Sequence, residues 1–299
     1  MEFGTSIEAF HAFLLKLGQI ALEANREVIG LPRSRLVTIL SEEGSVSESN
    51  SSVTMEFVTS TPRPSWFQVP AGYELADWYP WRFRRRLAIL RRPFLQLDDV
   101  ADPTILCAPG LIRDAFRSMV TWYRRGEIKA ARTKRMQQWM GRVNNLQRSK
   151  FNETVAERLR QLGWEARAEV KVTEILGRSF DRNYGDVDVL AWRTDASRVL
   201  AIECKDLQAQ TTISEVAEQL SDFRGETRAN GKRDHLRRHL DRLAVLSENA
   251  DVVARFLKLS LPLPIEGHLV FSHDVPMRFA WQHMAGQVKL SLLSTLELI

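Results

Sequence analysis

Two short apolar segments that each carry a charged residue constrain this chain more than any other feature. Residues 186–192 and 198–204 are rich in valine, leucine, isoleucine and alanine, which is typical of buried β-strands. Asp188 lies in the first segment, Glu203 lies in the second, and Lys205 follows directly. A lone charge in an apolar strand is costly to bury. We therefore expect these three side chains to compensate one another at one place in the fold.

The spacing of the three residues predicts how they meet. Side chains alternate between the faces of a strand, so Glu203 and Lys205 point the same way. Residues 193–197 are polar and short enough for a hairpin turn, which would bring Asp188 to within about one strand spacing, roughly 5 Å, of Glu203. Two such carboxylates suit Mg²⁺, which prefers a few carboxylates and water. The alternative is a solvent-facing salt bridge between a carboxylate and Lys205.

The order Asp, hairpin, Glu-x-Lys resembles the signature of the PD-(D/E)XK nuclease superfamily. Within that superfamily, the chain looks most similar to Mrr-type restriction endonucleases and archaeal Holliday-junction resolvases. The resemblance covers residues 147–299. It implies an α/β fold with a restriction-endonuclease-like αβββαβ core, in which helices flank a central mixed sheet. It also implies that Asp188, Glu203 and the backbone carbonyl of Cys204 bind the metal. Lys205 would position the attacking water.

The resemblance suggests two further site residues. The family usually carries an acid on the first helix, and Glu153 is the nearest candidate, as a catalytic residue and a ligand for a second metal. The usual spacing, however, falls on Asn152, and an ordinary solvated role for Glu153 stays open. Gln219 follows the lysine on the next helix, as a glutamine does in RecB-like members, or is simply a surface residue. Asp186 either faces the metal or caps its strand.

The apolar periodicity can be interpreted without the resemblance. Helical spacing predicts helices over residues 151–162 and 213–223, the second with an apolar face. Alternation predicts a strand over residues 166–172. Apolar runs at residues 268–272 and 288–293 complete the sheet or its edges. Strands with helices between them indicate a layered α/β domain.

The basic charge is concentrated ahead of this domain. Residues 80–150 contain 17 Lys and Arg against 5 Asp and Glu, whereas residues 1–79 contain 5 against 10 and residues 151–299 contain 20 against 22. A positive segment of this kind is expected where a protein follows a phosphate backbone. The candidate nucleic-acid-binding residues are Arg82, Arg84, Arg85, Arg86, Arg91, Arg92, Arg124 and Arg125.

Aromatic residues lie among these arginines, and bases can stack on aromatic rings. Alternatively, Trp78, Trp81 and Phe83 belong to a core and the arginines form a solvated face. Residues 234–242 form another basic helical patch whose histidines and arginines could face DNA. A zinc site there is not expected, since no cysteine pair accompanies the histidines.

The pattern along the chain predicts three regions. Residues 1–60 are predicted to form an N-terminal helix followed by a serine-rich loop or linker at residues 41–53. The first six residues resemble a cloning scar. Residues 61–146 read as a basic, mainly helical nucleic-acid-binding region. Residues 147–299 form the nuclease-like domain.

Several absences in the sequence narrow the function. There is no Walker-type phosphate loop and no apolar run of membrane-spanning length, and the two cysteines suit a reducing cytoplasm. We therefore predict a cytoplasmic nuclease that uses Mg²⁺ or Mn²⁺ to hydrolyse DNA, in bacterial defence or DNA repair. The alternative is a catalytically inactive DNA-binding or scaffold protein that retains the fold. A homodimer or further subunits, and endo- or exonuclease action, are left open.

Overall fold

The computed structural model divides the chain into two compact units, Met1–Asn144 and Asn145–Ile299. This division lies close to the predicted boundary between residues 146 and 147. The predicted boundary at residue 60 falls inside the first unit. The described residues are 2–63, 65, 68–79, 82, 85–128, 131, 133–210, 212–284 and 288–298. No helix among them is long and apolar enough to cross a membrane.

The first unit contains a four-stranded mixed sheet in the order β1-β4-β3-β2. Neighbouring strands are antiparallel except β2 and β3, which are parallel. The strands are β1 (Ile29–Pro32), β2 (Thr59–Ser60), β3 (Phe94–Gln96) and β4 (Thr104–Cys107). The region predicted as mainly helical therefore also supplies β3 and β4 to a sheet.

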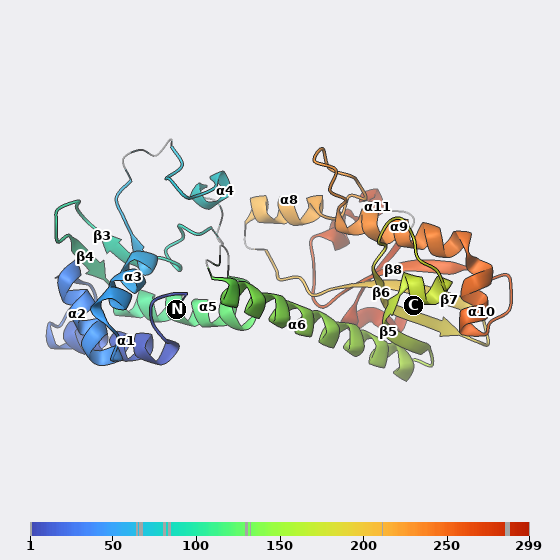
Figure 1. Ribbon diagram of the computed structural model, residues 1–299, viewed down its shortest axis with the longest axis horizontal. Helices are drawn as coiled ribbons and strands as arrows, with labels where there is room; N and C mark the ends of the chain where they lie inside the picture. Colours follow the sequence, from blue (N-terminus) through green and yellow to red (C-terminus); the bar gives the residue numbers. More distant parts are fainter. Residues whose placement is uncertain are drawn as a thin grey trace. The chain divides into compact units, whose positions relative to one another are not determined.

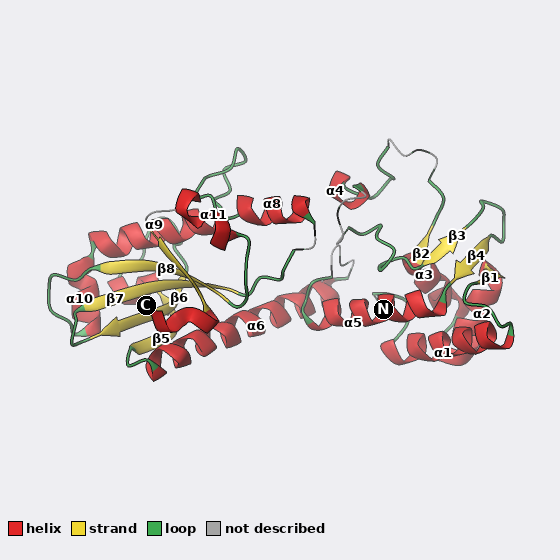
Figure 2. Ribbon diagram, turned by 180° about the vertical axis from the view of Figure 1, so that it is seen from behind, coloured by secondary structure: helices red, strands yellow, loops and turns green. Residues whose placement is uncertain are grey.

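The helices that begin and end in the first unit are α1 (Ile7–Glu23), α2 (Arg33–Gly44), α3 (Glu48–Val58), α4 (Leu75–Trp78) and α5 (Pro109–Arg124). Helices α1, α2, α3 and α5 bury one another and the sheet (Figure 2). The side chains of Phe13, Leu17 and Leu40 join Phe94 and Ile105 of the sheet in one apolar cluster. This burial of apolar surface is the main stabilising contribution to the unit.

The serine-rich segment is not a linker, contrary to the sequence prediction, because most of it is helical. The Ser47 side chain caps α3 by accepting a hydrogen bond from the backbone N–H of Asn50. Ser51, Thr54 and Met55 are buried against the rest of the unit. Tertiary packing thus stabilises a helix whose residues have low intrinsic helix propensity.

The segment that resembles a cloning scar is packed into the first unit. The Phe3 ring lies 4.8 Å from the Phe57 ring, and the Thr54 hydroxyl donates a hydrogen bond of 2.7 Å to the Phe3 carbonyl. Gly4 has a φ of +76°, and a Cβ there would lie 2.3 Å from the carbonyl oxygen of Asn50. Glycine is therefore the residue that suits this position.

The second unit is built on a five-stranded mixed sheet in the order β5-β6-β7-β8-β9. Strands β5, β6 and β7 pair antiparallel, and β7, β8 and β9 pair parallel. The strands are β5 (Glu165–Lys171), β6 (Asp186–Arg193), β7 (Arg198–Lys205), β8 (Ile265–Phe271) and β9 (Val288–Leu292). The predicted hairpin is confirmed, as are the two late strands. The strand predicted over residues 166–172 is β5, which ends at Lys171 because Val172 begins a helix.

Helices cover both faces of this sheet (Figure 1). They are α6 (Lys134–Gln161), which begins in the first unit, α7 (Val172–Leu176), α8 (Ile213–Ser221), α9 (His235–Glu248), α10 (Ala250–Leu257) and α11 (Met277–Met284), followed by the 3₁₀ helix η1 (Leu293–Leu298). Val155 and Leu159 of α6 pack on one face, and Leu236 and Leu246 of α9 pack on the other. The unit is therefore a layered α/β domain with a mixed sheet.

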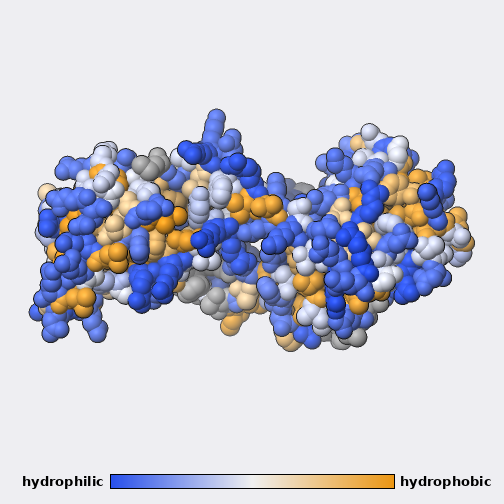
Figure 3. Space-filling view, turned by 90° about the horizontal axis from the view of Figure 1, so that it is seen from below, coloured by the Kyte–Doolittle hydropathy of each residue, from blue (hydrophilic) through white to orange (hydrophobic). Residues whose placement is uncertain are grey.

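Helix α8 buries a different face from the one predicted. Ile213 is 89 % exposed, whereas Glu215 and Gln219 are buried. Glu215 forms a capping box with Thr212 at the start of the helix. Figure 3 shows one face of the molecule, on which hydrophobic residues lie between hydrophilic ones.

Candidate active site

The β6–β7 hairpin places Asp188 opposite Glu203. Its last regular pair is Val189 with Ile202, so the next position pairs Asp188 with Glu203. Their exposed fractions are only 2 % and 5 %. Two acids are therefore buried side by side on adjacent strands, a costly arrangement unless cations or donors compensate them.

Asp188 is held at the point where the hairpin ladder ends. Its Oδ2 accepts a 2.9 Å hydrogen bond from the backbone N–H of Cys204. In a continued ladder this N–H would donate to a main-chain carbonyl of β6, so the Asp188 side chain replaces that carbonyl. The N–H and C=O of one strand residue point to the same side, so the Cys204 carbonyl also faces Asp188. The next carbonyl, that of Lys205, points the other way and accepts from Ser272.

Helix α6 supplies a cation to Asp188. Arg148 Nη2 lies 3.0 Å from Asp188 Oδ1 and 2.7 Å from Asp186 Oδ2, so one guanidinium bridges both acids. The Arg148 side chain is 47 % exposed. A half-exposed arginine can leave such a bridge at lower cost than a buried one.

Glu203 is compensated from two directions. Lys205 Nζ lies 2.5 Å from its Oε1, on the strand face that the sequence predicts for both residues. Arg242 Nη1 of α9 lies 2.6 Å from Oε2 and also donates to the Asp186 carbonyl at 2.9 Å. The Lys205 side chain keeps 17 % of its surface exposed, so its ammonium lies at the edge of the site.

The pKa values of the two acids are shifted in opposite directions. Burial and the nearby charge of Glu203 raise the pKa of Asp188 to about 6. Burial also acts to raise the pKa of Glu203, but the charges of Lys205 and Arg242 outweigh it and hold that pKa well below its usual range. Glu203 therefore stays ionised, and Asp188 is the acid that takes up a proton as the pH falls.

Helix α9 turns part of the predicted basic patch toward the sheet. His239 is almost fully buried, and its ring nitrogens have no hydrogen-bond partner among the described residues. Burial lowers the pKa of His239 to about 4, although the charge of Glu203 opposes this shift. A neutral imidazole thus lies close to Glu203. The expectation that the whole patch faces DNA is wrong for His239 and Arg242, which are buried.

The structure does not bring Glu153 to the two acids. Its side chain is 49 % exposed and forms an ion pair of 2.8 Å with Arg160. The neighbouring Asn152 is fully buried instead, and its Nδ2 donates to Glu169 of β5. Its Oδ1 is buried without a hydrogen-bond partner among the described residues. Of these two neighbours, Asn152 is therefore the one that faces inward, and Glu153 faces solvent.

Gln219 is buried on α8, but its contact is local. Its Nε2 donates a 3.3 Å hydrogen bond to the carbonyl of Gln208, and its Oε1 has no hydrogen-bond partner among the described residues. Among the described residues, no hydrogen bond joins it to Asp188, Glu203 or Lys205. Its predicted catalytic role stays a prediction.

Most of the arginines predicted to bind nucleic acid contact their own unit. Arg85 donates to the Trp78 carbonyl, Arg92 donates to the Thr59 carbonyl, and Arg125 pairs with Glu127. Arg86 pairs with Asp77, and Arg91 lies over the Trp122 ring. The remaining described members of the group are Arg82 and Arg124, and Arg84 lies outside the described residues together with the predicted stacking residues Trp81 and Phe83. Their binding to nucleic acid is untested by these contacts.

A family model described as "Anti-phage protein Upx-like" matches residues 1–292. The chain belongs to this Upx-like family. Its family thus points to a role in bacterial defence against phages. No curated protein and no solved structure matches the chain.

The donor set of this Upx-like chain can be compared with the needs of a divalent cation. Mg²⁺ is usually held by one or two carboxylates and keeps several waters. Asp188 and Glu203 supply two carboxylates from adjacent strands, and the Cys204 carbonyl faces the same gap. No group of three His, Cys, Asp or Glu side chains that could hold a metal occurs in the described parts of the chain. Two carboxylates and one carbonyl could supply the protein ligands of one such ion, whereas Glu153, the ligand expected for a second ion, pairs with Arg160 instead.

Sequence reasoning missed the roles of Arg148 and Arg242 in this Upx-like chain. Arg148 lies 40 positions before Asp188, and Arg242 lies 39 positions after Glu203. One signal was present for α9: His235, His239 and Arg242 recur at helical spacing, together with the buried Leu236 and Leu243. This spacing predicts a buried face and not a solvated one.

Proposed function

We propose that this chain is a metal-dependent nuclease that hydrolyses DNA with one Mg²⁺ or Mn²⁺ ion, and that this activity acts against phage DNA in the cytoplasm. The observation that carries the proposal is the position of Asp188. Its buried carboxylate caps the Cys204 N–H where the hairpin opens, directly opposite Glu203 and next to Lys205. This is the arrangement that the PD-(D/E)XK resemblance implies for its metal ligands and lysine.

The order of elements in the second unit supports the same proposal. Helix α6, strands β5, β6 and β7, helices α8 and α9, and strand β8 follow the αβββαβ order that a restriction-endonuclease-like core requires. The short helix α7 is an addition between the first two strands. The mixed sheet, antiparallel through β7 and parallel beyond it, agrees with that core.

Each residue has a role that its chemistry supports. Asp188, Glu203 and the Cys204 carbonyl would hold the ion, which when bound polarises a phosphoryl oxygen and lowers the pKa of a coordinated water. Lys205 is partly exposed and can hold the attacking water and offset charge that develops on the phosphate. Arg242 orients Glu203 from the opposite side through its bond to Oε2.

Charge balance favours joint binding of the ion and the phosphate. Asp186, Asp188 and Glu203 face Arg148, Lys205 and Arg242, which is three negative groups against three positive ones. A divalent cation alone would leave the site with excess positive charge. The negative phosphodiester of DNA would offset that excess, and Arg148 would then be free to move from Asp188 to the phosphate.

The same contacts favour a second candidate, a catalytically inactive DNA-binding or scaffold protein. Every carboxylate oxygen of Asp188 and Glu203 already has an N–H donor. In an inactive protein these ion pairs would be permanent, and no divalent ion would displace them.

Cleavage of plasmid and single-stranded DNA with Mg²⁺ or Mn²⁺ separates the two candidates. The nuclease proposal predicts cleavage by the full chain and its loss in Lys205→Ala. The matched control is Lys232→Ala, which removes an exposed lysine from a loop. Absence of cleavage of any DNA would favour the inactive protein. Equal cleavage by Lys205→Ala and the control would show that the cleavage does not depend on Lys205 and would contradict the proposed site.

A further inference from the structure

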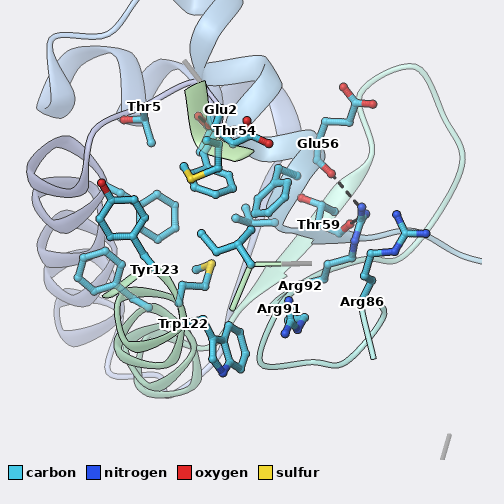
Figure 4. Close-up of a pocket in the computed structure, with 18 of the residues that line it drawn as sticks. Glu2, Thr5, Thr54, Glu56, Thr59, Arg86, Arg91, Arg92, Trp122 and Tyr123 are labelled. Carbon is cyan, nitrogen blue, oxygen red and sulfur yellow. Dashed lines mark hydrogen bonds between the residues drawn. The ribbon is translucent and has the colours of Figure 1, made fainter. Parts of the chain in front are cut away.

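The first unit contains a pocket that the nuclease proposal does not use. It has a volume of about 1330 Å³ and is lined mainly by side chains of α1, α3, α5, α6 and the loops between them (Figure 4). This exceeds the roughly 300–1,000 Å³ typical of pockets for small ligands. A ligand of nucleotide size or larger therefore fits.

The lining of the pocket combines positive charge with flat aromatic rings. Among the described residues, six arginines and eight aromatic residues line it, against two glutamates. The arginines are Arg33, Arg86, Arg91, Arg92, Arg135 and Arg142. An excess of cations selects an anionic ligand, and the rings select one with a planar apolar part.

Arginine and aromatic side chains are already stacked inside the pocket. The Arg91 guanidinium carbon lies 4.0 Å from the centre of the Trp122 ring. Figure 4 shows Arg91 and Trp122 beside each other, with Arg86 and Arg92 on the same side of the pocket. Guanidinium planes and aromatic rings are the surfaces on which nucleic-acid bases stack.

A second aromatic pair lies on the helices that line the pocket. The rings of Tyr123 and Trp139 stack with centroids 5.3 Å apart and an angle of 11° between their planes. The Trp139 Nε1 is buried without a hydrogen-bond partner among the described residues, so it can donate to an acceptor on a ligand. Arg142 lies over the Trp139 ring at 5.8 Å.

Two of the arginines that line the pocket are held in place by contacts within the first unit. Asp77 pairs with Arg86 at 2.6 Å, so that arginine has an acidic partner. Arg92 donates to the carbonyls of Thr59 and Glu56, which fix its position but carry no net charge. A phosphate near Arg92 would meet a positioned cation, at little cost in side-chain entropy.

We propose that this pocket binds a nucleotide, with the base stacked on the arginine and aromatic planes and the phosphate held by the arginines. The proposal goes beyond the nuclease assignment and holds whether or not the second unit cleaves DNA. The shared chemistry is a base joined to a phosphate. Its source is either a free nucleotide or an unpaired or terminal nucleotide of a nucleic-acid strand.

Binding of nucleotides to the full chain in EDTA, measured by isothermal titration calorimetry, tests this proposal without metal-dependent cleavage. The probes are AMP, ATP, a 5′-phosphorylated single-stranded oligonucleotide and a blunt duplex. Arg91→Ala should weaken binding by roughly tenfold or more, because one stacked plane and one charge are lost. Arg142→Ala, which changes an exposed side chain, should weaken binding in the same direction.

The matched control is Arg113→Ala, which removes an exposed arginine of α5 that does not line the pocket. Binding of AMP or ATP would identify a free nucleotide, and binding of the single strand alone would identify a strand as the source; both support the pocket. Absence of saturable binding to any probe would overturn the proposal, as would an equal loss in Arg113→Ala. Lys205→Ala should bind like the unchanged chain, so this result is independent of the nuclease test.

Discussion

The Asp188 carboxylate accepts a hydrogen bond of 2.9 Å from the backbone N–H of Cys204. This bond lies where β6 and β7 separate, one position beyond their last regular pair. A side chain thus replaces a main-chain partner, which satisfies the buried N–H and fixes the carboxylate in the plane of the sheet. The remaining oxygen, Oδ1, faces Arg148. Asp188 therefore contributes both to the strand pairing, through Oδ2, and to the candidate site, through Oδ1.

Arg148→Ala should strengthen binding of a divalent ion. Arg148 bridges Asp186 and Asp188, so an ion must displace it from Asp188 Oδ1. Removing it should lower the dissociation constant for Mn²⁺ by roughly tenfold, or about 1.4 kcal/mol. Calorimetric titration with Mn²⁺ measures the effect. Arg167→Ala, which removes a half-exposed arginine paired with Glu174, serves as the control. Unchanged or weaker binding in Arg148→Ala would contradict the competition.

Arg242→Met should destabilise the second unit. The substitution leaves Glu203 buried with Lys205 as its only charged hydrogen-bond partner among the described residues. Breaking a buried ion pair on one side costs about 3 kcal/mol or more in the free energy of unfolding. Chemical denaturation measures the loss. Arg255→Met, at an ion pair whose arginine is 75 % exposed, should change stability by less than about 1 kcal/mol. Similar losses in both variants would show that the Arg242–Glu203 pair contributes little.

His268 should make stability depend on pH. Burial lowers its pKa from 6.5 to about 4, although Glu266 opposes the shift, while Lys289 and Arg198 add to it. Between these two pKa values the unfolded chain binds a proton that the folded chain does not, so the free energy of unfolding falls as the pH falls.

His268→Gln should therefore reduce the difference in the free energy of unfolding between pH 7 and pH 5 by about 2 kcal/mol. Urea denaturation at both pH values gives this difference. His273→Gln, at an exposed histidine, is the matched control. If both variants keep the full pH dependence, His268 is not its source.

Glu153→Ala should leave catalysis almost unchanged. Glu153 is half exposed and pairs with Arg160, so its loss removes a surface ion pair worth about 0–1 kcal/mol. We expect DNA cleavage within roughly twofold of the unchanged chain. A loss of cleavage as large as that of Lys205→Ala would show that Glu153 acts in catalysis, as the sequence predicts.

The hairpin could be predicted because its signal is local. Residues 186–192 and 198–204 are continuous apolar runs around a polar turn, and the observed strands differ by one residue at their ends. The small sheet of the first unit was missed for the opposite reason. Its strands have only two to four residues, too few to show an alternating pattern.

The cations of the site could not be predicted because their partners are distant in sequence. Nothing near Arg148 indicates that it contacts Asp188, and only the packing of α6 on the sheet brings them together. Likewise, helix α3 forms in a serine-rich segment because Met55 and Val58 are buried in the core. Tertiary contacts override local propensity in both cases.

Cleavage of supercoiled DNA by the Asp188→Asn variant, in the presence of Mn²⁺, tests the metal-dependent nuclease most directly. This substitution keeps the size of the side chain but removes its charge. The matched control is Asp195→Asn, in the exposed hairpin turn. We predict that the unchanged chain and the control cleave equally and that Asp188→Asn loses roughly 100-fold or more of the rate. Equal rates in all three proteins, or no cleavage by any of them, would contradict the account.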